Sequence, residues 1–233
     1  MKISNNYPLI KKNKKISQLV LYASLALLVV GLVWSFTGAD ITQYTMAYLI
    51  LIPAYLLVQI SIFLANKWGR SPRPDEIIAQ SLKGLNDQYT LYNYNTGVPH
   101  LLVGPVGVWI IKPYHQFGTI SFNPEKNRYE QKGGANFISK MFGQEGLTDI
   151  ARESKMAIRD FDNFNKKMKL NIDIKPKIVN IFYSEKADVI AKNAPEATIH
   201  ADKLKDLVRS QAKVNPLKDE KINQIRKQLP DPN

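Results

Sequence analysis

The chain has 233 residues and a formal net charge of +12, because 32 lysines and arginines outnumber 20 acidic residues. It contains no cysteine, which excludes disulfide frameworks, Cys-ligated zinc, iron–sulfur clusters and cysteine nucleophiles. Hydrophobic residues make up 45% of the chain, too large a share for wholesale disorder.

Two uncharged apolar segments, residues 16–37 and 44–65, dominate the N-terminal third. At about 1.5 Å per residue, each would form a helix of roughly 33 Å, long enough to cross a hydrocarbon core of about 30 Å. Two buried core helices, or a signal peptide for the first segment, fit less well. Core helices keep a polar stripe, and signal peptides have shorter apolar regions. The sequence therefore predicts a transmembrane helical hairpin, with the lipid bilayer as a partner.

The charges that flank these segments predict the topology. Positive residues precede the first segment and follow the second, whereas the connecting loop carries only Asp40. The flanking cations are Lys11, Lys12, Lys14, Lys15, Lys67, Arg70 and Arg73. Positive charge marks the cytoplasmic side of a membrane. We therefore expect two spans in the inner (plasma) membrane, with both termini in the cytoplasm.

The remaining pattern divides the chain into five parts. They are a basic N-terminus (residues 1–15), the membrane hairpin (16–66), a proline-containing linker (67–74), a soluble domain (75–212) and a C-terminal tail (213–233). The residues up to 73 carry a net charge of +7 and the rest only +5. Most of the basic excess thus belongs to the membrane flanks, and the pI alone is a weak argument for nucleic-acid binding.

Apolar spacing predicts the elements of the soluble domain. We expect a helix over residues 75–86 and strands over 89–94, 101–103 and 106–111. Residues 104–107 read Gly-Pro-Val-Gly, which is turn chemistry, so the last two of these strands should form a hairpin.

The second half of the domain continues the pattern. Strands are expected over 119–122 and 128–131, followed by a polar connection (132–146) and an amphipathic helix of about 20 residues from 147. A buried strand (177–183), a short strand (197–200) and a helix (203–212) follow. This order predicts an α/β (or α+β) three-layer domain with helices on a central sheet. From Pro216 onward, a faint apolar stripe fits either a partner-binding helix or a frayed tail, and we interpret it as a tail.

Residues 98–120, VPHLLVGPVGVWIIKPYHQFGTI, resemble the nuclease-related domain (NERD) family. The residues that match the family's pattern are His100, Gly104, Pro105, Gly107 and Gly118, and Glu76 matches its first-helix glutamate. The resemblance covers about residues 74–212 and implies a restriction-endonuclease-like fold. Members of the family resemble Mg²⁺-dependent nucleases, and some are fused to membrane helices.

The residues that would carry the family's chemistry are replaced in this chain. The metal-binding aspartate falls on Pro99, the following glutamate on Lys112 and the lysine on Tyr114. Mg²⁺ takes hard oxygen ligands, often one or two carboxylates, and Glu76 is the single retained acid. The resemblance with these replacements predicts a pseudoenzyme with no metal, no cofactor and no metal-dependent nuclease activity.

The same strand offers a candidate ligand site. Lys112 and Tyr114 alternate onto one strand face and, with His115 and Gln116, could form a basic pocket for a phosphate or another anion. The alternative is a solvated strand end. For His100, a structural hydrogen bond within the sheet is the simpler interpretation. The candidate ligand-binding residues are Glu76, His100, Lys112, Tyr114, His115 and Gln116.

A basic run follows the amphipathic helix and consists of Lys166, Lys167, Lys169, Lys175 and Lys177. It could favour the helix dipole, touch the inner leaflet, track a nucleic-acid backbone or simply be solvated. Taken together, the sequence predicts a membrane-anchored, non-catalytic binding or scaffold module, with nucleic acid or another phosphate ligand as candidate partner. The alternatives are a membrane-tethered enzyme that acts on nucleic acid or another phosphate substrate through a site rebuilt around Glu76, Lys112 and Tyr114, or a membrane assembly factor that contacts only proteins.

Overall fold

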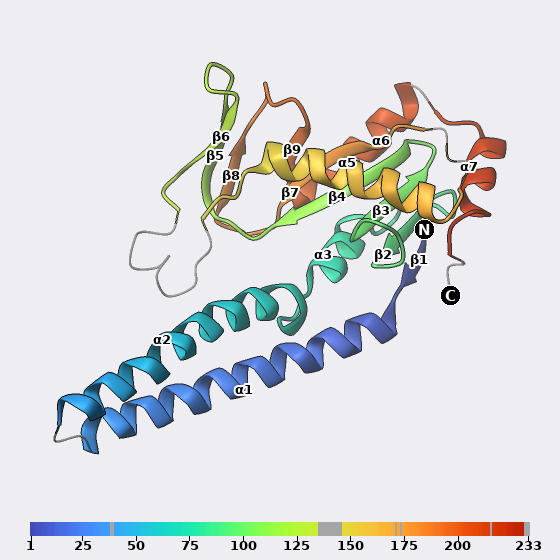
Figure 1. Cartoon of the computed structure of the whole chain (residues 1–233). Helices are drawn as coiled ribbons and strands as arrows, with labels where there is room; N and C mark the ends of the chain where they lie inside the picture. The colour runs from blue at the N-terminus through green and yellow to red at the C-terminus, as the bar shows by residue number, and fades with distance from the viewer. Residues whose placement is uncertain (38–39, 135–145, 171, 173, 215, 231–233) are drawn as a thin grey trace. The chain divides into compact units, whose positions relative to one another are not determined.

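The protein forms two compact units in a computed structural model that describes residues 1–37, 40–134, 146–170, 172, 174–214 and 216–230. Tyr7–Arg73 make one unit, and Met1–Asn6 together with Pro74–Asn233 make the other. The first unit is a pair of long helices, and the second is a mixed α/β domain (Figure 1).

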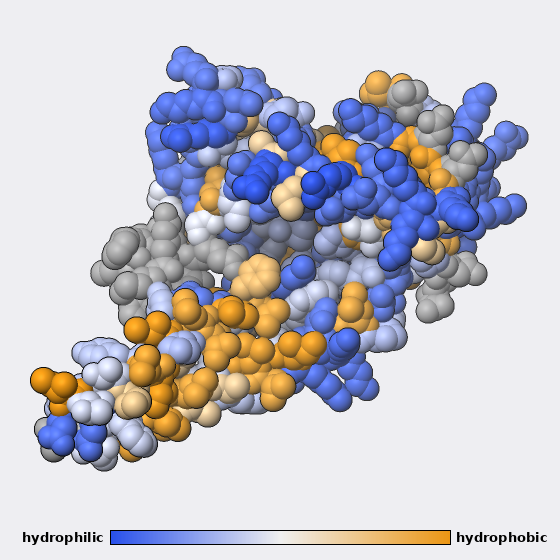
Figure 2. Space-filling model, viewed as in Figure 1, coloured by the Kyte–Doolittle hydropathy of each residue, from blue (hydrophilic) through white to orange (hydrophobic). Residues whose placement is uncertain are grey.

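The helical unit consists of α1 (Tyr7–Thr37) and α2 (Ile41–Leu64), which continues into a π-helical turn at Ala65–Gly69. Both helices are long and apolar enough to cross a membrane, and Figure 2 shows apolar side chains gathered over them. α1 begins at Tyr7, well before the apolar segment that starts at residue 16. The reason is that proline is tolerated in a first helical turn and lysine is a good helix former, so the helix extends beyond the apolar stretch.

Except for Ile10, the buried positions of α1 and α2 are small residues. The buried positions recur every seven residues in each helix: Ile10, Ser17, Ser24 and Gly31 in α1, and Ala47, Ala54 and Ser61 in α2. A Cβ atom at Gly31 would lie 2.6 Å from the Leu51 side chain. Small side chains let two helix backbones approach closely, and a seven-residue repeat keeps one face of each helix at the contact.

The α/β domain contains two sheets. The six-stranded sheet has the order β1-β2-β3-β4-β7-β9. Its strands are β1 (Lys2–Asn5), β2 (Thr90–Asn93), β3 (His100–Gly104), β4 (Gly107–Tyr114), β7 (Lys177–Phe182) and β9 (Ala197–His200). The three-stranded sheet has the order β6-β5-β8, formed by β6 (Arg128–Lys132), β5 (Gly118–Asn123) and β8 (Ala187–Ile190).

The β3–β4 hairpin confirms the predicted turn. Gly104 pairs with Gly107, and Pro105 and Val106 form the two-residue connection. Gly107 has a φ of 97°, in the left-handed region that glycine enters without steric cost. β4 continues to Tyr114, three residues beyond the predicted end, because it gains a parallel partner in β7 that the local pattern does not reveal.

Strand β1 is the largest departure from the sequence prediction, which assigned residues 1–15 to a basic N-terminus. β1 pairs in parallel with β2, with Lys2 opposite Thr90 and Asn5 opposite Asn93. Ser4 is almost fully buried. Four residues without a marked alternation carry no strand signal of their own, so their structure depends on a partner about 88 residues away. The sequence prediction also missed β8, a four-residue strand whose partner, β5, lies far away in the chain.

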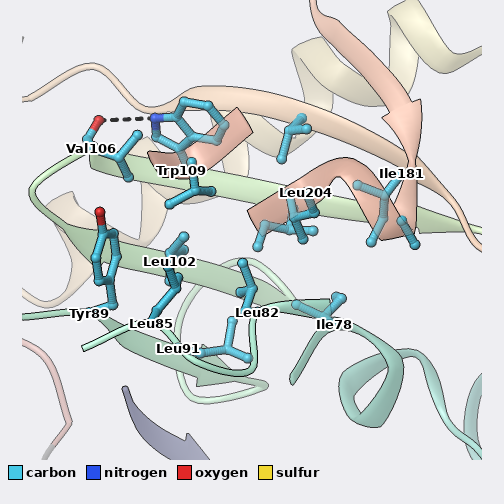
Figure 3. Packing of buried hydrophobic residues seen from close by; sticks show 14 residues of the cluster. Ile78, Leu82, Leu85, Tyr89, Leu91, Leu102, Val106, Trp109, Ile181 and Leu204 are labelled. Carbon is cyan, nitrogen blue, oxygen red and sulfur yellow. Dashed lines mark hydrogen bonds between the residues drawn. The ribbon is translucent and has the colours of Figure 1, made fainter. Parts of the chain in front are cut away.

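Helices cover both faces of the six-stranded sheet. On one face, α3 (Pro74–Ser81) and α6 (Leu204–Val214), which follows a 3₁₀ turn at Ala201–Lys203, pack against Leu102, Trp109 and Ile181. Figure 3 shows this core, in which the Trp109 indole donates to the Val106 carbonyl at 3.1 Å. On the other face, α5 (Ile150–Lys167) and α7 (Asp219–Arg226) cover Leu101, Val103, Val108 and Ile110.

The interpretation of the C-terminal stretch as a frayed tail is wrong for the residues that the structure describes. Ile222, Ile225 and Leu229 are buried in the core under α5 and α7. The Leu217 N–H also donates to the Pro105 carbonyl at 2.7 Å. An apolar stripe of only three residues is stabilised by tertiary burial rather than by helix propensity, so the sequence alone underestimates it.

Other boundaries shift by a few residues. The first domain helix ends at Ser81 rather than at residue 86, although Leu82 and Leu85 remain buried. The polar connection expected over 132–146 lies largely outside the described residues, as does residue 215 near the start of the C-terminal stretch.

Candidate functional site

Lys112 and Tyr114 lie near the end of β4 and point to the face of the sheet that α5 covers. Alternate residues of β4 serve opposite faces: Trp109 and Ile111 belong to the core under α3 and α6, whereas Val108 and Ile110 belong to the core under α5. Lys112 and Tyr114 continue the second series, because successive strand residues alternate. The predicted placement of both residues on one strand face is confirmed.

One carboxylate oxygen holds both residues. The Lys112 Nζ lies 2.8 Å from Glu153 Oε2, and the Tyr114 hydroxyl donates to the same oxygen at 2.9 Å. Glu153 comes from the first turns of α5, which Asp149 caps by accepting from the Arg152 N–H. We call Lys112, Tyr114 and Glu153 the Lys112 cluster.

The apolar side of the cluster fixes the two donors. The Tyr114 ring stacks on Phe182 with centroids 5.2 Å apart, and the Lys112 ammonium lies 5.6 Å from the centroid of the Tyr114 ring. Lys112 is 16% exposed and Glu153 is 38% exposed. The donors are therefore held rigidly by the sheet, and the acceptor is the more accessible member.

Burial and hydrogen bonding shift the ionisation of all three groups. Burial lowers the pKa of Lys112, and the hydrogen bond and charge of Glu153 oppose that shift. Burial strongly raises the pKa of the Tyr114 phenol, and the Glu153 charge adds to the effect. Burial alone would raise the pKa of Glu153, but hydrogen bonds from Lys112, Thr148 and Tyr114 together outweigh it and lower that pKa.

A second polar network adjoins the cluster. Asn180 on β7 is in direct register with Lys112, is fully buried and donates to Thr198 Oγ1 at 3.3 Å. Tyr129 bonds the same Thr198 hydroxyl at 2.9 Å and lies 3.5 Å from Glu196 Oε2. Burial raises the pKa of Glu196, although the Tyr129 hydrogen bond opposes this. The side-chain oxygen of Asn180 is buried with no hydrogen-bond partner among the described residues.

A pocket of about 400 Å³ opens on the β8–β9 side of this network. Its lining includes Glu196 and Thr198 together with Asp188, Lys192 and Lys203. Acidic and basic side chains are mixed around it, so its charge favours no single class of ligand.

The resembled site has two further positions, Glu76 and Pro99, on other parts of the domain. Glu76 belongs to α3, which packs on the opposite face of the sheet. Pro99 is exposed just before β3, where its carbonyl accepts from the Tyr94 N–H at 2.7 Å. The carboxylate that Lys112 and Tyr114 contact is that of Glu153, which the sequence did not suggest.

His100 occupies a structural position in the sheet. It is buried, its Nδ1 lies 2.8 Å from Asn93 Oδ1, and its ring meets the Tyr94 ring edge-on at 5.0 Å. Asn93 in turn donates to Asn5 of β1 at 2.8 Å. The hydrogen bond predicted for His100 is thus present, and it helps to connect β1 to the sheet.

His115 and Gln116 follow Tyr114 at the end of β4. Gln116 is buried and its amide group donates to the Gly146 carbonyl at 3.3 Å. His115 is half-buried. The five lysines of the basic run, Lys166, Lys167, Lys169, Lys175 and Lys177, are all exposed.

Sequence reasoning missed the partners that complete the site. Glu153, Asn180, Thr198, Tyr129 and Glu196 come from four different elements and the connections between them. One sequence feature could have identified Glu153. On the predicted helix it is adjacent to the inward-facing Ser154, so it lies at the margin of the buried stripe. Among the described residues, no group of three or more His, Cys, Asp or Glu side chains is arranged to hold a metal ion.

Comparison of the chain with protein-family models, with curated proteins and with solved structures yields no match.

The lowered pKa of Glu153 makes the stability of the domain depend on pH through this residue. Its ionised form should stabilise the fold above the ordinary pKa, 4.5, and this contribution should vanish as pH falls through the lower folded-state pKa. Glu153→Gln should therefore be less stable than wild type at pH 7, and the difference should shrink below about pH 4. Denaturant unfolding between pH 3 and 7 measures this, with the exposed Glu125→Gln as control. A difference that stays constant with pH would contradict the ion pair.

Proposed function

We propose that this protein is a membrane-anchored binding or scaffold module whose α/β domain is NERD-like, with a restriction-endonuclease-like fold and no nuclease activity. One observation carries the proposal: the cation and the phenol that stand at the resembled catalytic positions are both bound to Glu153. That carboxylate is engaged in an internal ion pair, and Glu76 belongs to a helix whose apolar residues pack on the other face of the sheet.

The resemblance to NERD gains support from the order of the elements. A helix, a three-stranded meander with the Gly104–Gly107 turn, the long helix α5, the buried strand β7 and helix α6 follow one another as the resemblance implies. The parallel pairing of β4 with β7 is consistent with a sheet of this kind.

Membrane anchoring is supported by α1 and α2, which are long and apolar enough to span a bilayer. The topology is supported by β1, because a strand that pairs with β2 must lie on the same side of the membrane as the rest of the domain. The flanking lysines and arginines favour the cytoplasmic side for both. We therefore place the domain and the N-terminus at the cytoplasmic face of the inner (plasma) membrane.

The proposed partner is anionic and carries phosphate, with nucleic acid as the macromolecular candidate. The exposed lysines of the basic run offer cations to such a backbone. In this arrangement the domain binds its partner without cleaving it, and the two helices hold the complex at the membrane.

The test uses the full-length chain in uncharged detergent micelles with labelled single- and double-stranded DNA and RNA. A gel scores shift and cleavage with Mg²⁺ or with EDTA over a salt series. We expect a salt-sensitive shift without cleavage. Replacing Lys166, Lys167 and Lys169 by Gln should weaken the shift and reduce its salt slope by about one unit for each phosphate that a lysine no longer neutralises.

The matched control replaces three exposed lysines elsewhere, Lys203, Lys213 and Lys218, by Gln. It should leave the shift unchanged. Mg²⁺-dependent cleavage that disappears in Glu76→Ala or Glu153→Gln would overturn the non-catalytic assignment. The absence of any shift would overturn nucleic acid as the partner.

A further inference from the structure

The Lys112 cluster has the form of a ligand site that is filled by the protein's own carboxylate. Two donors of different kinds, an ammonium and a phenol, converge on a single oxygen, Glu153 Oε2, at 2.8 and 2.9 Å. Charge-assisted bonds of this type recognise carboxylates and phosphates. Both donors belong to β4, whereas the acceptor belongs to a helix and is the most exposed member. Loss of the Glu153 carboxylate would therefore leave the donor geometry in place.

Glu153 leaves a buried hydrogen-bond acceptor near the cluster unsatisfied, the side-chain oxygen of Asn180. Asn180 is fully buried and stands in register beside Lys112 on the neighbouring strand. Within the described part of the chain, its side-chain oxygen has no hydrogen-bond partner. Residues in direct register project to the same side of a sheet, so this acceptor faces the same layer as the Lys112 ammonium. A carboxylate has no proton to donate to it, and an unsatisfied buried acceptor is costly.

We propose that Lys112, Tyr114 and Asn180 form a recognition site for a protonated phosphate-class oxyanion, hydrogen phosphate or a phosphate monoester, and that Glu153 is its internal ligand. The charged oxygens of such an anion accept from Lys112 and Tyr114, while its P–OH donates to Asn180. The inference rests on the proposed function, because it specifies the phosphate chemistry of a binding domain without catalysis.

The place that Glu153 occupies in α5 should also raise the affinity of the site for an anion. It lies in the first turns of an 18-residue helix, where the helix dipole favours negative charge. The neighbouring Arg152 and Lys155 are exposed and supply further positive charge. Because a bound anion must displace Glu153, the wild-type affinity equals the affinity of the open site multiplied by the small fraction of molecules in which the site is open.

The experiment titrates the full-length chain, in uncharged detergent, with inorganic phosphate by calorimetry. Glu153→Ala should bind phosphate about 10-fold or more tightly than wild type, since the internal competitor is gone. Adding Lys112→Met to Glu153→Ala should abolish this gain. Glu130→Ala, which removes a carboxylate from an ion pair on β6, should behave as wild type. Glu153→Gln serves as a second opened variant, and thermal unfolding verifies that each variant is folded.

Sulfate is the matched probe for Asn180, because it has the size of phosphate but carries no proton near neutral pH. We expect it to bind the opened variants more weakly than phosphate. Equal binding of both anions would overturn the role of Asn180.

The source of the phosphate is distinguished by a second arm, in which Glu153→Ala is placed in nanodiscs of phosphatidylcholine with or without phosphatidic acid. Lys112-dependent stabilisation by phosphatidic acid identifies a lipid headgroup, and binding of inorganic phosphate alone identifies a soluble ligand. If neither opened variant shows Lys112-dependent binding in either arm, the inference is wrong. The gel assay would still decide the proposed function, since it depends on the exposed lysines and on cleavage.

Discussion

A fragment that begins at Pro74 should unfold at a clearly lower temperature than the same fragment with residues 1–6 attached through a flexible linker. β1 covers the edge of β2. There the Lys2 backbone N–H donates to the Tyr89 carbonyl at 2.9 Å, and the Asn6 backbone N–H donates to the Asn93 carbonyl at 3.0 Å. The Asn93 side-chain amide also donates to Asn5 Oδ1 at 2.8 Å. With these three hydrogen bonds contributing about 1 kcal/mol each, the loss should reach about 3 kcal/mol. For a domain of this size, that lowers the melting temperature by roughly 6–12 °C.

The matched control replaces the six residues by a Gly/Ser hexapeptide on the same linker, which should not restore stability. Circular dichroism during heating measures all three chains. Equal melting temperatures with and without residues 1–6 would show that β1 contributes nothing to the domain. A fragment cut after the two apolar helices lacks β1 and therefore exposes an unpaired strand edge on β2.

Ile225→Ala should destabilise the domain by about 2–4 kcal/mol. Ile225 is 1% exposed in the core that joins α7 to α5 and the sheet. Its truncation leaves a cavity that a helix docked at both ends cannot easily close. Denaturant unfolding of the full-length chain in detergent, followed by tryptophan fluorescence, measures the change.

The control for this substitution is Gln224→Ala, one position earlier on the exposed side of α7. Its unfolding midpoint should stay close to that of wild type, since an exposed helical alanine costs little. If Ile225→Ala and Gln224→Ala unfold alike, α7 is not anchored and the C-terminal stretch behaves as the tail that the sequence suggested.

The elements that could be predicted are those whose signal is local. The β3–β4 hairpin follows from the turn chemistry of residues 104–107 and from the apolar strands on either side. The buried strand β7 follows from its continuous apolar run, and α5 follows from its three- and four-residue spacing. These patterns are contained within about 20 residues, so no knowledge of the fold is needed to recognise them.

The sequence predicts the two donors of the candidate site but not their acceptor. The alternation of a strand places Lys112 and Tyr114 on one face, and the structure agrees. What they meet there depends on how α5 crosses the sheet, which brings Glu153 to a residue 41 positions earlier in the chain. Glu76 is limited in a similar way. A sequence motif gives its distance along the chain from the other motif residues, but not the face of the sheet on which its helix packs.

The sequence by itself determined the two apolar helices, the order of most strands and helices, and the shared face of Lys112 and Tyr114, since hydrophobic periodicity and turn chemistry act over short stretches. Only the tertiary structure decided that residues 2–5 are a strand, that α7 is part of the core and that Glu153 closes the candidate site. Each of these depends on burial or hydrogen bonding between segments far apart in the chain. The free energy that stabilises them comes from tertiary interactions, which a local sequence pattern does not reveal.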